Sequence, residues 1–153
     1  MRRKDKEVTD KNIIESVFNE ALDCNMGLSS KDKPYIIPMN FAYEDNCLYL
    51  HSANEGKKID ILKKNDNVCI EAHIKTEIVK ADKACNWGAK YLSVIGFGKA
   101  SFVNDNNDKK KALTLMMKKY SGNDSWEMPD ESLSKVTVIK VVLDSITCKK
   151  SGI

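Results

Sequence analysis

The chain lacks the sequence features that mark membrane-spanning, secreted and zinc-binding proteins. No apolar run approaches the roughly 18 residues that a membrane-spanning helix requires. The charged segment Met1–Glu7 is followed by no apolar stretch, so we expect neither a secretory nor a twin-arginine signal. The five cysteines form no C-x-x-C pair, and the two histidines complete no metal-ligand spacing with them. These absences predict a cytoplasmic protein with free thiols and no bound metal.

An excess of charge of one sign is also missing. The 25 basic residues nearly balance the 22 acidic ones, and the net charge of +3 indicates neither a nucleic-acid partner nor another strong polyanion. With 42% hydrophobic and 31% charged residues, the composition is typical of a globular protein and not of a disordered one. The length predicts a single domain over residues 1–153, large enough to bury roughly two-thirds of its unfolded surface.

The first half of the chain predicts a helix followed by a β-hairpin. Thr9 or Asp10 can cap a helix whose apolar residues recur with helical spacing, and Gly27 is expected to end it. Two apolar stretches, Lys33–Tyr43 and Cys47–His51, then flank an acidic turn that contains asparagine. This arrangement is typical of two antiparallel strands joined by a tight turn.

The second half predicts further strands, with one more long helix between them. The expected strands are Val68–Ile74, Tyr91–Val103 and Val136–Leu143, and Glu77–Ala81 extends the first of them or pairs with it. The expected helix is Asp105–Tyr120, in which Met116 and Met117 belong to a helix face. Gly96 and Gly98 suit a bend, a bulge or a close approach of backbone to a ligand. About six strands, mostly linked by hairpins, favour a mainly β (α+β) fold, a small barrel with peripheral helices, over a doubly wound sheet.

The stretch Tyr49–Leu62 carries the clearest chemical signal. A strand ends there in small polar residues, turns on Gly56 and enters a helix over about Gly56–Lys64, with Lys57 and Lys58 in its first turn. Cations are disfavoured at this end, because free N–H groups and the helix dipole already make it positive. A docked anion, most often phosphate, would explain the lysine pair, and the alternative is two solvated lysines on a lysine-rich surface.

Several segments in a fixed order carry a resemblance to a known family. They are Arg2-Arg3-Lys4-Asp5, Pro34–Phe41, His51–Lys58, Trp87–Gly98 and the closing strand. In these segments the chain resembles the pyridoxamine 5′-phosphate oxidase-like split-barrel flavoproteins, and within them the nitroimidazole-resistance (Nim) branch. The resemblance implies a six-stranded split β-barrel, a homodimer, and one FMN in each of two interface grooves.

The resemblance also implies which residues hold the flavin. The family binds the flavin phosphate with a Ser-Arg-Lys segment, which reads Gly56-Lys57-Lys58 here. Lysine keeps the charge of arginine but loses its planar fork, and glycine offers only its backbone N–H. The remaining implied cofactor-binding residues are Pro38, Met39, Asn40 and Phe41 beside the ring, His51, Ser52 and Ala53 around the ribityl chain and phosphate, and Trp87, Tyr91 and Ser93 at the dimer interface.

One histidine is expected to be catalytic. His51 matches a position near the flavin that is linked to activity in the Nim branch, so the resemblance implies a proton donor there. The oxidase itself binds its substrate's phosphate through an Arg-x-His pair near the C-terminus, and the only arginines here are Arg2 and Arg3. We therefore expect a flavin-dependent oxidoreductase that reduces a small planar acceptor, such as a nitroheteroaromatic compound or a quinone, instead of acting on pyridoxamine phosphate.

Three alternatives stay open at this level. The chain could be a flavin-binding stress or redox module without turnover. It could bind haem, as some split-barrel relatives do, with His51 or His73 as the axial ligand. It could also bind a deazaflavin in place of FMN. Purely structural roles are open as well, since His51 could only end a strand and Trp87 and Tyr91 could only pack an interface.

Overall fold

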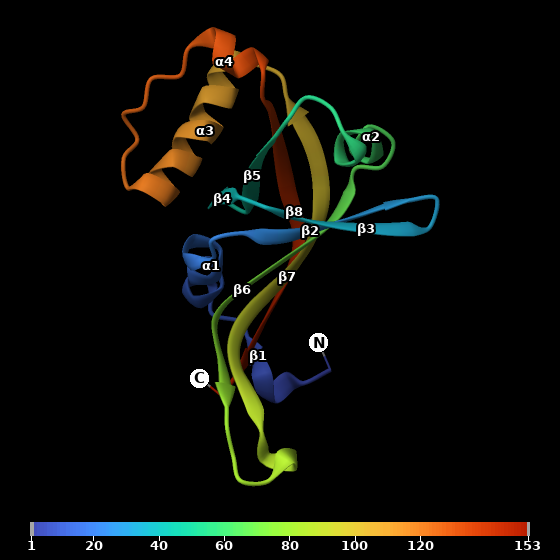
Figure 1. Ribbon diagram of the computed structural model, residues 1–153, viewed down its shortest axis with the longest axis vertical. Helices are drawn as coiled ribbons and strands as arrows, with labels where there is room; N and C mark the ends of the chain where they lie inside the picture. Colours follow the sequence, from blue (N-terminus) through green and yellow to red (C-terminus); the bar gives the residue numbers. More distant parts are fainter. Residues whose placement is uncertain (1, 153) are drawn as a thin grey trace.

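The computed structural model describes residues 2–152 and consists of one strongly curved antiparallel sheet with helices at its margins (Figure 1). The strands are β1 (Glu7–Val8), β2 (Cys24–Ser30), β3 (Lys33–Met39), β4 (Phe41–Glu44), β5 (Cys47–Ser52), β6 (Asn67–Val79), β7 (Gly88–Val103) and β8 (Thr137–Ser151). The α-helices are α1 (Lys11–Glu20), α2 (Lys57–Leu62), α3 (Asn106–Ser121) and α4 (Asp130–Ser134), and two 3₁₀ turns cover Lys4–Lys6 and Ala84–Asn86. No helix within residues 2–152 combines the length and the apolarity needed to cross a membrane.

The strand order explains why the sheet rolls into an incomplete barrel. The strands pair in the order β3-β2-β6-β7-β8-β5-β4, with β1 added to β8. The two outermost strands of this path, β3 and β4, are consecutive in the chain and are joined by Asn40 alone. The two edges of the sheet must therefore meet at Asn40, although they form no ladder with each other. This is the split barrel that the sequence predicts.

The number of strands differs from the prediction of six, because the described residues contain eight. The apolar stretch Lys33–Tyr43 divides at Asn40 into β3 and β4. The short strand β1 and the strand β2 carry no strong strand signal, since β2 reads Cys-Asn-Met-Gly-Leu-Ser-Ser and its polar and glycine residues have low β-propensity. The last strand is also longer than expected and reaches Ser151.

The prediction that Gly27 ends the first helix is wrong. The helix α1 does begin at its predicted cap, where the Asp10 carboxylate accepts a hydrogen bond from the Asn12 N–H, but it ends before β2. Gly27 lies inside β2, between Ile36 on β3 and Cys69 on β6. A Cβ at Gly27 would lie 3.4 Å from the Cys69 carbonyl oxygen, so glycine here permits close contact between neighbouring strands.

Other local predictions are confirmed. The hairpin of β4 and β5 turns at Asp45 and Asn46, whose φ angles of 49° and 65° are those of a tight two-residue turn. The strand β6 continues through an irregularity after Ile74 and pairs with β7 to its end. The register of β7 against β8 shifts between Phe97 and Gly98, where β8 carries the extra residue, Asp144.

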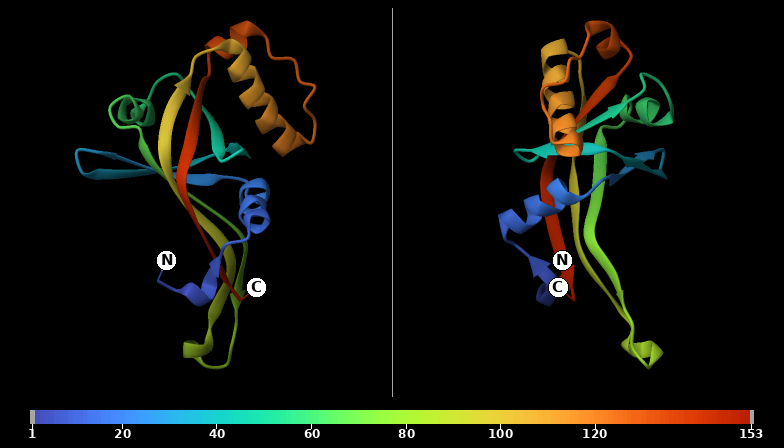
Figure 2. Two further views of the ribbon diagram at one scale, coloured as in Figure 1. Left: turned by 180° about the vertical axis from the view of Figure 1, so that it is seen from behind. Right: turned by 60° about the vertical axis from the view of Figure 1, so that its left-hand side comes forward.

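The core fills the barrel and is closed by α1. Fully buried side chains come from every long strand and from this helix; they include Phe18, Met26, Phe41, Leu48, Leu50, Ile70, Val94 and Ile139. The Phe18 ring stacks on Tyr43 with 4.5 Å between centroids and meets Phe41 edge-on. Figure 2 shows that α3 lies at one end of the molecule and the tip of the β6–β7 hairpin at the other.

Candidate functional site

A hollow of about 390 Å³ lies between β5 and the C-terminal half of α3. Its lining residues are Asn40, His51, Leu113, Met116, Met117, Tyr120 and Met128. Because side chains alternate along a strand, Leu50 and Ser52 point into the barrel while His51 faces outward toward this hollow. Leu113 and three methionines make the walls largely apolar, with only a few polar groups among them. Such a lining suits a flat aromatic ligand.

Two residues near the end of α3 hold this helix in place. The Lys119 ammonium group donates a hydrogen bond to the Phe18 carbonyl oxygen at 2.9 Å and lies 3.5 Å from the Phe41 ring centroid. Burial lowers the pKa of Lys119 to about 8. The Tyr120 hydroxyl accepts from the Phe41 N–H at 2.9 Å and donates to the Leu22 carbonyl oxygen at 2.8 Å. The wall of the hollow is therefore fixed to both α1 and β4.

The surroundings of His51 favour the neutral form of its imidazole. The pKa of His51 is lowered below its usual value, mainly by burial and to a smaller extent by the neighbouring positive charge of Lys58. The Lys58 ammonium group also lies 3.5 Å from the sulfur of Met39, at the end of β3. Lys58 thus extends from α2 toward the corner of the barrel at which His51 and Asn40 lie.

The variant Lys58→Gln should raise the pKa of His51. Removing the nearby cation removes a charge that disfavours the imidazolium form, so His51 should bind a proton at higher pH than in the parent protein. Histidine NMR titration measures this directly. Lys57→Gln is the matched control, because the Lys57 ammonium group lies over the Tyr35 ring instead. Equal His51 pKa values in the parent and the Lys58 variant would show that the charge of Lys58 does not act on His51.

The two lysines at the start of α2 point in different directions. The Lys57 ammonium group lies 4.5 Å from the Tyr35 ring centroid, whereas Lys58 contacts Met39. Gly56 precedes them with a φ of 122°, which favours glycine, and a Cβ built on it would meet no atom within 4 Å. The segment before α2 is therefore open to a ligand, and Lys58 is the lysine on the side of the hollow.

The rest of the predicted segment beside β3 and β5 divides between surface and core. Pro38, Asn40 and Ala53 are exposed, and Met39 is buried. The Phe41 ring is fully buried, and its N–H is already bound by Tyr120. Ser52 is 6% exposed, and its hydroxyl oxygen is buried without a hydrogen-bond partner among the described residues. An orphaned buried hydroxyl of this kind is costly and marks a place where a polar ligand group would be stabilising.

A second group of predicted residues lies apart from the hollow in the single chain. Trp87 is at the outer end of the β6–β7 hairpin, which Figure 2 shows extending away from α2 and α3, and its indole N–H donates to the Ala81 carbonyl oxygen at 2.6 Å. Tyr91 and Ser93 follow on β7, where Ser93 pairs with Lys149. The structure therefore brings His51, Asn40 and Lys58 together, but not Trp87, Tyr91 and Ser93 with them.

The face of the sheet that carries Ser93 also carries exposed apolar side chains. Ile36, Ile95 and Phe97 are 68%, 42% and 57% exposed, respectively. Strand register places Ile36 and Phe97 in one row across the sheet, with Gly27 and Cys69 between them, and a shallow hollow of about 410 Å³ lies over this row. Exposed apolar surface of this kind is typical of interaction surfaces.

Sequence reasoning missed the contribution of α3 to the site. It assigned Met116 and Met117 to a helix face without saying what that face covers, and it gave Leu113, Tyr120 and Met128 no role. The signal was present, because Leu113, Met116, Met117 and Tyr120 follow the i, i+3, i+4, i+7 spacing of one helix face. The strand that this face covers is not encoded by the spacing.

Comparisons with known proteins converge on one family. The family model described as pyridoxamine 5′-phosphate oxidase matches residues 10–150. A solved structure of a candidate 5-nitroimidazole antibiotic resistance protein from Bacteroides thetaiotaomicron VPI-5482 is 35% identical, with 94% of this chain and 86% of that chain covered and a TM-score of 0.84. No curated protein matches the chain.

Two more distant structures share the fold. The flavocytochrome Anf3 from Azotobacter vinelandii is 17% identical, with a TM-score of 0.86 over 99% of this chain and 72% of that one. The FAD and haem binding protein from Mycobacterium smegmatis is 14% identical, with a TM-score of 0.87 over 96% and 74%. At these identities the likeness shows the architecture alone.

Proposed function

The chain belongs to the pyridoxamine 5′-phosphate oxidase family, and from this membership we propose that it is an FMN-dependent oxidoreductase that reduces small planar acceptors. The observation that carries the proposal is that His51 and Asn40 line an apolar hollow, with the charge of Lys58 close enough to act on His51. The 35% identical protein from Bacteroides thetaiotaomicron, a candidate in 5-nitroimidazole resistance, favours nitroheteroaromatic compounds among these acceptors, with quinones as chemically similar candidates.

The residues around α2 fit a flavin phosphate. Lys58 forms no ion pair with an acidic side chain among residues 2–152, so its charge is free for an anion. The open backbone at Gly56 leaves room beside it, and the unpartnered Ser52 hydroxyl lies on the adjoining strand end. Lys57 can contribute a second charge after its side chain turns away from Tyr35.

The chain's own side chains would bind the flavin phosphate, shield the hollow from water and protonate the acceptor. A bound flavin supplies the hydride chemistry, with electrons from a nicotinamide or another reductant. Lys58 and Lys57 would hold the phosphate, and the segment around Asn40 would line the edge of the ring. Met116 and Met117 line one side of the hollow and would shield a bound ring there from water. His51 faces the same space and would deliver a proton from a ring nitrogen to the reduced acceptor.

His51→Ala should reduce nitro compounds at least about tenfold more slowly than the parent, since a positioned proton donor commonly contributes that much or more. The parent rate should rise as the pH falls toward the lowered pKa of His51, because only the imidazolium form donates readily. The variant should lose this pH dependence. Steady-state assays over pH measure both, and equal flavin content serves as the control. A variant with the parent rate and profile would exclude the proton-donor role.

The exposed apolar side chains Ile36, Ile95 and Phe97 would form the interface of a homodimer. Burying Ile36, Ile95 and Phe97 against a second copy removes apolar surface from water, and Ser93 and Tyr91 lie along the same strand as two of them. A partner's Trp87, Tyr91 and Ser93 would then reach the flavin that one chain holds. Light scattering should give twice the mass of one chain, and a monomer that still binds flavin would contradict this arrangement.

The absorption spectrum of the purified protein tests the cofactor directly. A two-banded yellow spectrum that releases FMN on heating supports the proposal, and nitro-compound and quinone reduction assays follow from it. A Soret band, indicating haem, would overturn it. Release of FAD or a deazaflavin would overturn the assignment of FMN and leave the flavin-binding hollow in place.

A further inference from the structure

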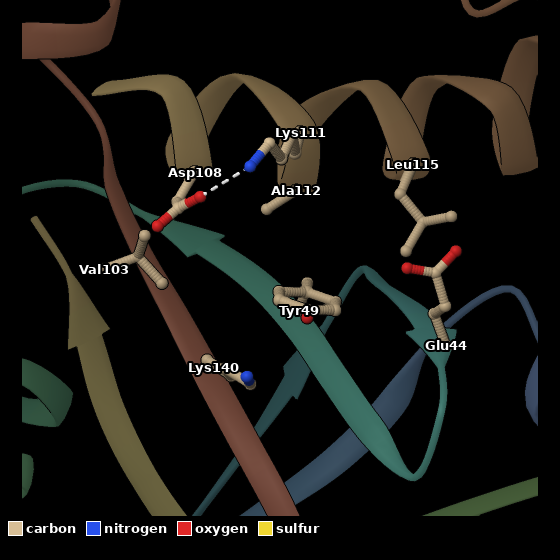
Figure 3. Close-up of a pocket in the computed structure, with 8 residues that line it drawn as sticks. All are labelled: Glu44, Tyr49, Val103, Asp108, Lys111, Ala112, Leu115 and Lys140. Carbon is tan, nitrogen blue, oxygen red and sulfur yellow. Dashed lines mark hydrogen bonds and ion pairs between the residues drawn. The ribbon is translucent and has the colours of Figure 1, made fainter. Parts of the chain in front are cut away.

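The helix α3 lies between two hollows of different character. One, of about 330 Å³, is lined by four charged side chains, and its Asp108 carboxylate pairs with the Lys111 ammonium group at 2.9 Å (Figure 3). The other is the hollow beside His51, which is lined by three of the six methionines of the chain: Met116, Met117 and Met128. Of the two, the hollow beside His51 therefore suits a flat apolar ring, because flexible thioether side chains can follow the outline of the ring.

Among the apolar side chains of the hollow beside His51, Met128 alone does not belong to α3. It lies in residues 122–129, an irregular segment between α3 and α4 that we call the α3–α4 segment. Figure 1 shows this segment running back beside α3 from the end of the helix to α4. Met128 is half-buried, and every other residue of the segment is exposed. The α3–α4 segment therefore contributes one side chain, Met128, to the wall of the hollow.

The α3–α4 segment is tied to α3 on both sides of Met128. Before it, the Trp126 indole N–H donates to the Ser121 hydroxyl oxygen at 3.1 Å, and this hydroxyl donates to a carbonyl oxygen of the same helix at 2.7 Å. Beyond it, the Asp130 carboxylate at the start of α4 pairs with the Lys110 ammonium group at 2.9 Å. These two ties set the position of Met128 relative to the helix.

Given the proposed function, which assigns the acceptor to the space beside His51, we propose that Met128 limits the size of the planar acceptor that the hollow admits. Lys119 and Tyr120 bond to α1 and β4, so the part of the wall that α3 forms has little freedom to retreat. No hydrogen bond joins residues 122–129 to a strand within the described chain. An acceptor too large for the hollow would therefore have to displace Met128 first.

Two nitro compounds that differ by one fused benzene ring, 2-nitrofuran and 2-nitrobenzofuran, test this proposal. The measured quantity is kcat/KM for the two-ring compound divided by kcat/KM for the one-ring compound. Met128→Ala should raise this ratio about tenfold over the parent, because it removes the side chain that the second ring would meet. Met128→Trp should lower the ratio about tenfold. Comparison with the parent cancels the intrinsic reactivity of the two compounds.

Two further variants serve as matched controls. Glu127 is the exposed neighbour of Met128 and does not line the hollow, so Glu127→Ala should leave the ratio within about twofold of the parent. Met128→Leu keeps the side-chain volume and should stay within about threefold. If the ratio is unchanged in both Met128→Ala and Met128→Trp, or if Glu127→Ala shifts it as much as Met128→Ala does, Met128 does not limit acceptor size.

A binding measurement separates this proposal from the proposed function. Equilibrium dialysis of the two nitro compounds against the protein as purified needs neither turnover nor a reductant. If the parent carries no flavin or reduces neither compound, the proposed function fails, and dialysis still decides the role of Met128. The ratio of the two affinities should then shift in Met128→Ala and Met128→Trp in the same directions as kcat/KM. Ratios that do not shift, or a parent that binds neither compound, would overturn the role of Met128.

Discussion

The double variant Lys57→Ala/Lys58→Ala should bind FMN at least about 100-fold more weakly than the parent protein. A hydrogen bond from a charged donor contributes about 1.5–3 kcal/mol, and each 1.4 kcal/mol is a factor of ten in affinity. Both lysines lie in the first turn of α2, which contains no other cation that could replace them. Neither has an ion-pair partner among the described residues, so both charges are available to the phosphate. Quenching of flavin fluorescence during titration measures the affinity.

The single variants make this prediction sharper. Lys58→Ala should account for most of the loss, because Lys58 already reaches the corner at Met39, whereas Lys57 must first leave Tyr35. Lys75→Ala/Lys80→Ala is the matched control, with the same change in net charge on the distant β6–β7 hairpin. Unchanged FMN affinity in the double variant would exclude α2 as the phosphate site.

Gly98→Ala should lower the free energy of unfolding by about 3 kcal/mol or more, because the added methyl group would force two strands of backbone apart. A Cβ at Gly98 would overlap the carbonyl oxygen of Val142. That part of β8 has no freedom to retreat, since Val142 pairs with Lys99 on β7 and with Cys47 on β5. The close approach of β7 to β8 beside Phe97 thus depends on a residue without a side chain.

Gly88→Ala on the same strand is the control for this prediction. Its added Cβ would lie 4.0 Å from its nearest neighbour, the Cβ of Val79, which is ordinary contact. Urea denaturation should give a free energy of unfolding within about 1 kcal/mol of the parent for this variant. A Gly98→Ala protein as stable as Gly88→Ala would show that the bulge can rearrange.

Features that depend on a few neighbouring residues could be predicted from the sequence. The Asp10 cap of α1, the Asp45-Asn46 turn and the start of α2 after Gly56 all lie where the pattern indicates. Each is decided by a local hydrogen bond or by a backbone conformation that its own side chain allows. The close backbone approach at Gly98 belongs with these, since glycine in a long strand is a local signal too.

Features that depend on pairing between distant segments could not be predicted in this way. The strand β2 has little β-propensity, and it forms because β3 and β6 satisfy its backbone on both sides. Gly27 was expected to end the first helix, but the same pairing places it in β2, in close contact with β6. The division of Lys33–Tyr43 at Asn40 likewise follows from the meeting of the two sheet edges.

The candidate site shows the same division. By itself the sequence determined the family pattern, the place of His51 in the strand before α2 and the two lysines that open α2, because these depend on strand pattern and a local turn. Only the tertiary structure decided that α3 faces His51 across a hollow, that Lys57 and Lys58 separate, and that Lys31 and Lys33 lie near Lys57 and Lys64. These contacts link residues far apart in the chain, and it is the curvature and register of one sheet that bring them together.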